Sequence, residues 1–391
     1  MATVYLARGR GARIAAGHPW VYTTEVAHIS GQVEPGDTVS VVDSRGACLG
    51  RGFINPASQI LVRLLTHDEE PVDAELIRRR VAAAWAYRRR LYGPSPAVCR
   101  VIFGEADFLP GCIVDKFADL LVIQSLALGI ERWVPVILDA LRELMRPRGI
   151  YARNDVPVRE LEGLAQERGP VGAPFDPVVW IEENGLLMRV DVAEGQKTGY
   201  FLDQRENRAA IRPYAAGARV LDCFANTGGF ALNAVVGGAT EVLAVDAAAE
   251  ALATLEANAA RNGLAGRITT ETGNAFDVLR RLDAEQARFD LIVLDPPAFA
   301  KNRAALPGAT RGYKEINLRA LRMIPPGGFL VTCSCSFHMA PELFRATVAD
   351  AAQDAHRRLR LVEERGAARD HPVLVGYDES HYLKCLIYEV R

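Results

Sequence analysis

The sequence has few lysines, no paired-cysteine motif and no long apolar run. Only five of its 46 lysine and arginine residues are lysines, and the formal net charge is −2. This near-neutral balance excludes a protein coated with basic surface, although the arginine-rich residues 1–100 are compatible with local phosphate contacts. No stretch reaches the roughly 18 apolar residues of a membrane span. The first 20 residues lack the apolar core of a secretory signal, so we expect a cytoplasmic protein without a membrane partner.

Cysteine usage agrees with that expectation. The seven cysteines are odd in number and scattered along the chain, and none belongs to a C-x-x-C pair. A zinc ribbon and a thioredoxin motif are therefore excluded, and no metal is expected. Reduced thiols are the default in a protein without a secretion signal. One of these thiols is a candidate for chemical activity.

Three patterns divide the 391 residues into expected domains, and the predicted fold class is α/β. Residues 1–70 read as short strands broken by turns, which predicts a mostly antiparallel β module. Residues 71–190 form an expected α+β unit that opens with a helix over 72–93. The arginine triplets of that helix indicate a solvated face, or alternatively a face for RNA. Residues 191–391 alternate apolar strands with helices, which predicts a Rossmann-like parallel sheet with right-handed crossovers.

The run VLDCFANTGGFALNA, residues 220–234, predicts a cofactor loop between a buried strand and a helix. Ligands of open α/β sheets bind at the carboxyl ends of the strands. The loop lacks the G-x-G-x-x-G of a dinucleotide site, and an acid precedes it. An anionic acid suits the ammonium and hydroxyl groups of S-adenosylmethionine better than a pyrophosphate. The expected binding residues are Asp222, Phe224, Asn226 and Gly228, the glycine because it lets the backbone approach a ligand closely. The alternative is a tight turn without a ligand.

The next two strand ends add candidates for the same cofactor. Asp246 ends the second strand of the sheet, where a carboxylate can accept hydrogen bonds from both ribose hydroxyls. Asn274 and Ala275 follow the third strand, where an amide side chain is expected to meet the adenine edge. The alternative for Asn274 is a loop residue that caps a turn.

The segment EGQKTGYFLDQRENR, residues 194–208, is unusually dense in charged, amide and aromatic groups for a linker. We interpret it as a lid or wall over the cofactor. Tyr200 or Phe201 is expected to stack on adenine, and polar contacts are expected from Asp203, Gln204 or Arg205. The alternative is a solvated helix start.

Two further motifs predict the chemistry. Asp295 opens a stiff Asp-Pro-Pro turn after the fourth strand, where its carboxylate can accept a hydrogen bond from a target base. Cys333 and Cys335 follow the next strand. Carbon C5 of a pyrimidine is a weak nucleophile, and a thiolate that adds to C6 makes C5 enamine-like. We expect Cys335, further into the loop, to be that nucleophile and Cys333 to be a packing residue. A buried, inert Cys335 is the alternative.

Together these motifs resemble the bacterial class I methyltransferases that make 5-methylcytidine in 23S rRNA. The resemblance covers almost the whole chain and rests on GHPWVY, KTGYFLDQR, DCFANTGGF, DPPAFAKN, RGYKEINLRAL, TCSCSFHM and the late YLK. It implies an N-terminal PUA domain, a central α+β domain and a Rossmann-like methyltransferase domain. It also implies S-adenosylmethionine as cofactor, 23S rRNA or a large-subunit precursor as substrate, and a homodimer. The family's catalytic cysteine, ribose acid and base-proximal acid fall on Cys335, Asp246 and Asp295.

The same resemblance implies RNA contact through the N-terminal barrel, with Arg13, His18 and Trp20 as candidates, although Trp20 is also a plausible core residue. Many cytosine-C5 enzymes carry a second cysteine in the loop that reads DPPAF here, so a different base must remove the C5 proton. Two other functions stay open. One is a guanine N-methyltransferase, which needs no nucleophilic cysteine. The other is a non-catalytic ribosome-assembly protein that binds RNA through a degenerate domain.

Overall fold

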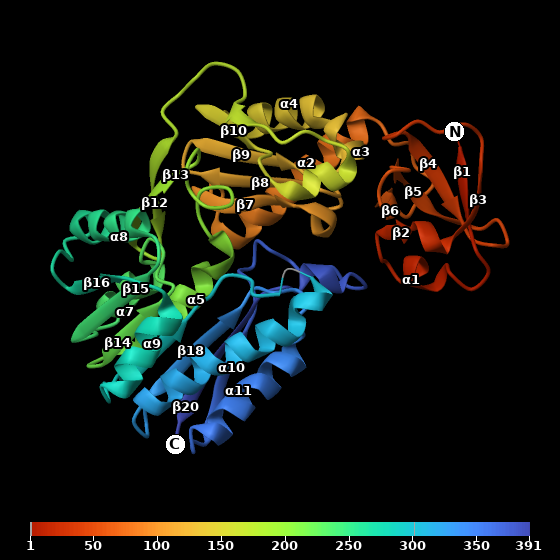
Figure 1. The fold of residues 1–391 in the computed structure, drawn as a ribbon. Coiled ribbons are helices and arrows are strands. Elements are labelled where there is room, and N and C mark those ends of the chain that lie inside the picture. The colour runs from red at the N-terminus through yellow and green to blue at the C-terminus, as the bar shows by residue number, and fades with distance from the viewer. Residues whose placement is uncertain (1, 301) are drawn as a thin grey trace. The chain divides into compact units, whose positions relative to one another are not determined.

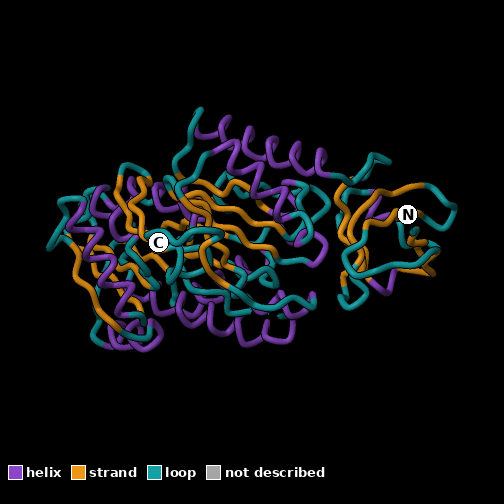
Figure 2. Tube along the Cα trace, turned by 90° about the horizontal axis from the view of Figure 1, so that it is seen from above, coloured by secondary structure: helices purple, strands orange, loops and turns teal. Residues whose placement is uncertain are grey.

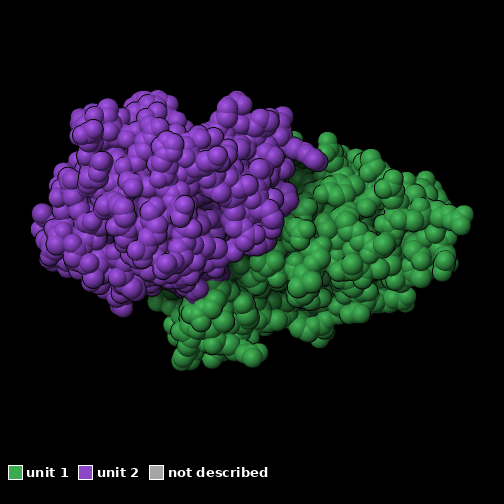
Figure 3. All heavy atoms as spheres, turned by 90° about the horizontal axis from the view of Figure 1, so that it is seen from below, with its two compact units in different colours: residues 1–181, 190–202, 369–380 green, residues 182–189, 203–368, 381–391 purple. Residues whose placement is uncertain are grey.

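A computed structural model describes residues 2–300 and 302–391, which divide into two compact units (Figure 3). Unit 1 comprises residues 1–181, 190–202 and 369–380, and unit 2 comprises 182–189, 203–368 and 381–391. The chain passes from one to the other through a two-stranded hairpin, β12 (Val178–Glu183) and β13 (Leu186–Asp191). The three-domain boundaries expected from the sequence stay a prediction.

The first sheet of unit 1 has six strands in the order β2-β6-β5-β4-β1-β3 (Figure 1). Its neighbours are antiparallel except for the parallel pair β1–β4, as the short alternating runs predict. Alternate residues such as Val39 and Val41 are fully buried and build the core of this sheet. The elements are β1 (Thr3–Leu6), α1 (Ala12–Ala15), β2 (Trp20–Tyr22), η1 (Thr23–Glu25), β3 (Val26–Ser30), β4 (Thr38–Val42), β5 (Cys48–Ile54) and β6 (Ile60–Thr66).

The second sheet of unit 1 is mixed, with the order β11-β10-β9-β8-β7, and two helices share its core. Helix α2 begins where the Asp73 carboxylate accepts a hydrogen bond from the Leu76 N–H, 2.9 Å away, which satisfies one free donor of the first turn. The elements are α2 (Ala74–Tyr92), β7 (Val98–Phe103), η2 (Gly104–Asp107), β8 (Cys112–Phe117), β9 (Leu120–Ser125), α3 (Leu128–Glu131), α4 (Val134–Met145), β10 (Gly149–Arg153), η3 (Pro157–Glu162) and β11 (Arg168–Pro170).

One member of the arginine triplet 88–90 of α2 departs from the solvated face that the sequence indicates. Arg88 is fully buried, whereas Arg89 and Arg90 are exposed. The Arg88 guanidinium donates to the Asp107 carboxylate and to the backbone carbonyls of Arg100 and Asp370. This arginine therefore has a structural role, because a buried cation persists only where its donors are matched.

Unit 2 contains a seven-stranded sheet in the order β16-β15-β14-β17-β18-β20-β19. The first five strands run parallel, which confirms the predicted Rossmann-like sheet. Strand β20 runs antiparallel to both of its neighbours, β18 and β19, and this end of the sheet was not predicted. The strands are β14 (Arg219–Cys223), β15 (Glu241–Asp246), β16 (Ile268–Thr272), β17 (Leu291–Leu294), β18 (Phe329–Ser334), β19 (Leu359–Arg365) and β20 (Lys384–Val390).

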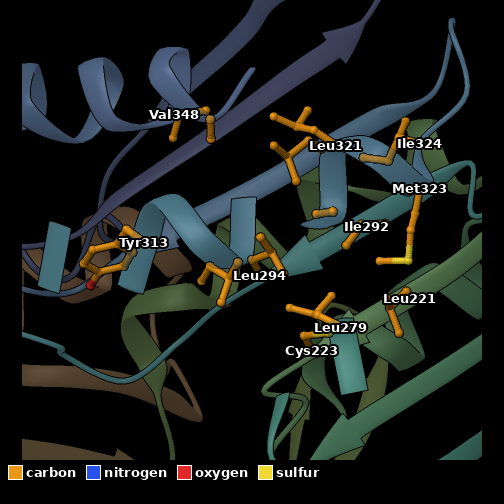
Figure 4. Close-up of a cluster of buried hydrophobic side chains, with 14 of the residues drawn as sticks. Leu221, Cys223, Leu279, Ile292, Leu294, Tyr313, Leu321, Met323, Ile324 and Val348 are labelled. Carbon is orange, nitrogen blue, oxygen red and sulfur yellow. The ribbon is translucent and has the colours of Figure 1, made fainter. Parts of the chain in front are cut away.

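Helices cover both faces of this sheet, so alternate strand residues enter two separate cores (Figures 1 and 2). Leu221 and Ile292 belong to the core under α9, α10 and α11 (Figure 4), and Val220 and Val293 to the opposite core. No helix in the described ranges is long and apolar enough to span a membrane. The helices of unit 2 are α5 (Arg205–Ala210), α6 (Arg212–Ala215), α7 (Gly229–Val236), α8 (Ala249–Arg261), α9 (Ala275–Ala284), η5 (Arg303–Ala305), α10 (Leu306–Met323) and α11 (Pro341–Asp354). The short helix η4 (Leu202–Gln204) has residues of both units, and η6 (Asp378–Ser380) belongs to unit 1.

We predict that Arg88→Ala lowers the free energy of unfolding by about 3–5 kcal/mol, because it leaves the buried Asp107 carboxylate without its cation. Urea unfolding followed by circular dichroism measures this loss. Arg90→Ala, which removes an exposed arginine two positions along, is the matched control and should change stability by less than about 0.5 kcal/mol. Equal effects of the two substitutions would contradict a structural role for Arg88.

Candidate active site

The candidate site lies where the parallel strands of unit 2 end. Strands β14, β15, β17 and β18 point the same way, so their carboxyl ends share one edge of the sheet. Register places Cys223 beside both Val245 and Leu294, and Leu294 beside Thr332. Three acids and the two cysteines singled out from the sequence lie at these strand ends or directly after them: Asp222, Asp246 and Cys333 within the strands, and Asp295 and Cys335 just beyond them. The fold therefore brings together motifs separated by up to a hundred residues of chain.

The loop after β14 has an unusual backbone. Phe224, Asn226 and Gly228 all have positive φ values, of 64°, 48° and 89°. Such left-handed conformations are uncommon outside glycine and persist only where neighbours hold them. The Asn226 N–H donates to Asp246 Oδ2 at 2.8 Å, so the end of β15 braces the loop.

The structure gives another reason for a glycine at position 228, in addition to the predicted approach of a ligand. A Cβ atom at Gly228 would lie 2.5 Å from Cγ of Leu255, which occupies the space beside the glycine. The absence of a side chain therefore serves the packing of α8 against the loop. Contact between the Gly228 backbone and a cofactor stays a prediction.

Asp222 is buried beneath this loop. Its Oδ2 accepts from the Ala231 N–H in α7 at 2.9 Å, whereas Oδ1 has no hydrogen-bond partner among the described residues. Burial raises the pKa of this carboxyl, and the nearby carboxylates of Asp295 and Asp246 raise it further. The expected anionic Asp222 is therefore favoured only when a cation is close. A buried acceptor without a partner fits a ligand that brings a positively charged donor.

The second and third strand ends present polar groups of different kinds. Asp246 is half-buried, and its Oδ1 accepts from the Ala248 N–H at 2.9 Å. A carboxylate has about four acceptor positions, so Asp246 keeps capacity for ribose hydroxyls. Asn274 caps α9, because its Oδ1 accepts from the Phe276 N–H at 2.9 Å, and Ala275 is buried at the start of that helix. Capping was the alternative considered for Asn274, and its contact with adenine stays a prediction.

The segment 194–208, which is expected to form a wall over the cofactor, belongs partly to unit 1 and partly to unit 2. Tyr200 is buried in unit 1, and Asp203 belongs to unit 2. Asp203 Oδ2 accepts from the Tyr382 hydroxyl at 2.6 Å. The alternative of a solvated helix start is wrong, because Arg208 at this helix is buried and forms an ion pair with Glu183 at 2.9 Å. Roles of Tyr200 and Asp203 in cofactor binding stay predictions.

The loops after β17 and β18 meet at the candidate nucleophile. Cys335 is half-buried, and its thiol donates to the backbone carbonyl of Pro296, with 3.8 Å between sulfur and oxygen. The preceding residue, Asp295, accepts a hydrogen bond at Oδ1 from Gln204 Nε2 at 2.8 Å. The structure thus places the Asp-Pro-Pro turn and Cys335 in contact.

Cys333 has a different environment from Cys335. It is fully buried and lies opposite Cys385 in the antiparallel pairing of β18 with β20. A hydrogen bond with the Cys385 thiol and burial both raise the pKa of Cys333 well above its ordinary value. A thiol with a raised pKa forms little thiolate at neutral pH, so Cys333 is poorly suited to nucleophilic attack.

The three residues proposed to contact RNA all make contacts within unit 1. The Arg13 guanidinium donates to Glu25 at 2.7 Å and lies over the Tyr22 ring. His18 is buried, and its ring packs edge-on against Tyr377. RNA contact by either residue stays a prediction.

Trp20 is also held by its neighbours. Its indole N–H donates to Glu105 at 2.8 Å, and the Arg63 guanidinium lies 5.0 Å from the centre of its ring. These contacts use the polar atom and one face of the indole. They support the alternative of a structural Trp20, and base stacking by this side chain stays a prediction.

Two residues near the site, Tyr313 and Lys384, were not candidates from the sequence, and Gln204 was a candidate only for a polar contact with the cofactor. Gln204 holds Asp295, and the Tyr313 hydroxyl lies 3.0 Å from Ser334 Oγ and 3.1 Å from Ser336 Oγ. Lys384 Nζ donates to the Ser336 carbonyl at 2.7 Å. Each lies inside a motif already noted, KTGYFLDQR, RGYKEINLRAL or YLK, but no spacing rule links these motifs to the cysteine.

Comparison with known proteins identifies the class. A family described as S-adenosylmethionine-dependent methyltransferase matches residues 170–388, and a PUA-like domain matches residues 4–67. Among solved structures, a putative SAM-dependent methyltransferase from Streptococcus mutans is similar over all of both chains, with a TM-score of 0.84 and 18% identity. A putative methyltransferase complexed with SAH has a TM-score of 0.86 over all of both chains, at 19% identity. The fold and the family match together define an S-adenosylmethionine-dependent methyltransferase.

Full-length relatives narrow this class. Proteins named ribosomal RNA large subunit methyltransferase I are 42% identical in Cronobacter sakazakii, over 97% of each chain, and 42% identical in Tolumonas auensis, over 98% of each chain. The chain belongs to the ribosomal RNA large subunit methyltransferase I family.

We predict that Asp246→Ala weakens S-adenosylmethionine binding about ten- to a hundredfold, since hydrogen bonds to a charged acceptor contribute about 1.5–3 kcal/mol. Isothermal titration calorimetry measures the dissociation constant, and the unfolding temperature of the variant shows that it is folded. Asp277→Ala removes an exposed carboxylate that pairs with Arg280 and is the control. An unchanged affinity in Asp246→Ala would rule out the ribose contact.

Proposed function

We propose that this protein methylates C5 of a cytidine in 23S rRNA and that Cys335 is the covalent nucleophile. The observation that carries the proposal is the position of Cys335, a half-buried thiol in contact with the Asp-Pro-Pro turn. The names of the full-length relatives support ribosomal RNA as the substrate. Methylation of a nitrogen would need no thiol at this place, because nitrogen already offers a lone pair.

The proposed reaction follows from the weak nucleophilicity of C5. The Cys335 sulfur forms a bond to C6, which moves electron density to C5. S-adenosylmethionine, when bound, would supply an electrophilic methyl group on a sulfonium, and breaking the bond between methyl and sulfur would leave S-adenosylhomocysteine. After C5 has gained the methyl, a base takes the C5 proton, the C5–C6 double bond re-forms and the bond between sulfur and C6 breaks, which returns the free cysteine.

Asp295 is proposed to orient the target base. Its Oδ1 is already held by Gln204, and Asn207 Nδ2 in turn donates to Gln204 Oε1 at 2.6 Å. A carboxylate held by such a chain of hydrogen bonds keeps one direction, and its second oxygen can accept from an exocyclic amine. This arrangement gives Gln204 a positioning role that the sequence did not indicate.

Three further parts of the proposal concern partners and location. RNA is proposed to contact the N-terminal part of unit 1 through Arg13 of α1, His18 of the following loop and Trp20 of β2. A homodimer and a cytoplasmic location also belong to the proposal. Sedimentation equilibrium at several protein concentrations tests the dimer, since a mass that stays at the 42.6 kDa of one chain contradicts it.

We predict that Cys335→Ala reduces methyl transfer to 23S rRNA by at least about a thousandfold, as removal of other covalent nucleophiles does. Transfer of a radiolabelled methyl group measures the rate. Cys333→Ala is the matched control and should keep most of the activity. Retained activity in Cys335→Ala would instead indicate methylation of a nitrogen and would make Cys335 structural.

Trapping with 5-fluorocytidine distinguishes these mechanisms directly. Fluorine at C5 does not leave as a proton does, so the bond between the cysteine and C6 persists and survives denaturation. We expect such an adduct on 23S rRNA that contains 5-fluorocytidine, mapped by peptide mass spectrometry to Cys335. An adduct at Cys333 would keep the reaction but reassign the nucleophile. Methyl transfer without any adduct would reject C5 chemistry.

A further inference from the structure

A single buried lysine lies beside the proposed nucleophile. Lys384, the first residue of β20, has only 3% of its surface exposed. Antiparallel pairing places it directly opposite Ser334, one residue before Cys335. Its Nζ donates to the backbone carbonyls of Ser336 and Tyr382, both at 2.7 Å. Lys384 is therefore hydrogen-bonded to the residue that follows the cysteine.

Burying the ammonium group of Lys384 costs free energy unless an anion is close. No carboxylate in the described part of the chain forms an ion pair with it. Burial lowers the pKa of Lys384 to about 8, and the negative charge of a Cys335 thiolate raises it. A buried ammonium that is neither in water nor paired with a carboxylate is strongly disfavoured, and such groups are commonly functional.

Among the described residues, the other ionisable groups that face the Cys335 loop, namely Tyr313, Cys333 and Asp295, supply no cation. Tyr313 from α10 is neutral at physiological pH, because burial raises its pKa. Cys333 is neutral as well, because its hydrogen bond with Cys385 and its burial raise its pKa. Asp295, next to the carbonyl that accepts from Cys335, carries a negative charge that disfavours a thiolate. Lys384 is the group whose charge opposes this effect.

We propose that Lys384 is a positioning residue that stabilises the Cys335 thiolate through its charge and orients the Cys335 loop through its hydrogen bond to Ser336. This inference deepens the proposed function, since it names the group that prepares the nucleophile. An ammonium has three N–H donors, and the two backbone carbonyls use two of them. The positive charge of Lys384 is present below about pH 8 and is lost above it. Its electrostatic stabilisation of the thiolate is therefore strongest at and below neutral pH.

The test is the pH dependence of Cys335 alkylation by iodoacetamide, which reacts with the thiolate rather than the thiol. Full-length protein is labelled between pH 6 and 10, and the label on Cys335 is quantified by peptide mass spectrometry. We expect Lys384→Met to raise the midpoint of the profile by about one pH unit, which lowers the rate at pH 7 about tenfold. Lys384→Arg should retain most of the wild-type profile, because it keeps the charge.

A surface lysine provides the control. Lys314 of unit 2 pairs with Asp350 and Asp354 at the surface, and Lys314→Met should leave the Cys335 profile unchanged. A Lys384→Met profile that matches the wild type would overturn the inference. A shift of equal size in Lys384→Arg would show that loop shape, and not charge, is responsible, and would also overturn it.

A reciprocal variant keeps the inference testable if Lys384→Met does not fold. Coupling between two charges acts equally on both, so loss of the thiolate must lower the pKa of Lys384. Cys335→Ser, whose hydroxyl stays neutral, should therefore shift the pH profile of Lys384 acetylation by acetic anhydride to lower pH. An unchanged acetylation profile would contradict the coupling.

Failure of this inference and failure of the proposed function give different results. If 5-fluorocytidine RNA forms the Cys335 adduct equally fast in wild-type protein and Lys384→Met from pH 6 to 8, the function stands and the role of Lys384 is rejected. If the alkylation and acetylation profiles shift as expected but no adduct forms, the lysine–cysteine coupling stands and C5 chemistry is rejected. Slower adduct formation at pH 7 in Lys384→Met, with Lys384→Arg close to wild type, supports both the proposed function and the role of Lys384.

Discussion

The geometry of the candidate site depends on one buried hydroxyl group. The Tyr313 oxygen lies within hydrogen-bonding distance of Ser334 Oγ and Ser336 Oγ, the two residues that flank Cys335. Ser336 Oγ also accepts from the Ala300 N–H at 3.1 Å, which connects the loop after β17 to the same group. Buried networks whose members are all satisfied hold one arrangement. Because the serines on either side are held from α10, the direction of the intervening cysteine is restricted as well.

An aromatic cluster extends this constraint to the cofactor loop. The Phe299 ring packs against Tyr313 with 4.7 Å between centroids and against Phe276 with 5.7 Å, and Phe224 lies at its edge, 6.5 Å away. Phe224 belongs to the loop after β14, Phe276 to α9 and Phe299 to the loop after β17. Interiors are packed as densely as crystals, so a shift of one ring moves its neighbours. The loops proposed for the cofactor and for the target base are thus parts of one packed body, whose apolar core continues beneath Tyr313 (Figure 4).

Strands β14, β15, β17 and β18 could be predicted because each is a short apolar run with a polar residue at or directly after its end, and this pattern is local. Strands β19 and β20 could not, since their antiparallel placement depends on partners across the sheet. Arg88 illustrates a missed signal: it continues the buried positions Ile77, Val81 and Ala84 at helical spacing. Its partner Asp370 lies 282 residues away, so the reason for its burial is visible only in the folded chain. Gly228 was expected in the cofactor loop from its neighbours, yet its reason for being glycine is Leu255, which no local pattern indicates.

The order of the strands also places negative and positive side chains at different positions along the edge of the sheet. Asp246, Asp222 and Asp295 follow or end β15, β14 and β17, which are consecutive in the sheet, and β18 with Cys335 comes next. Burial, together with repulsion from Asp295 and Asp246, raises the pKa of Asp222, so a positively charged ligand is favoured at this end of the edge. Lys384 enters from the far side of β18 because β20 runs antiparallel there. The acids therefore lie toward the cofactor loop, where a sulfonium cation is expected, and the lysine lies toward the thiol, where a negative charge must form. Because β20 runs in the opposite direction, its first residue, Lys384, lies at the edge where the parallel strands end. A negative and a positive side chain can therefore act at the same edge of the sheet.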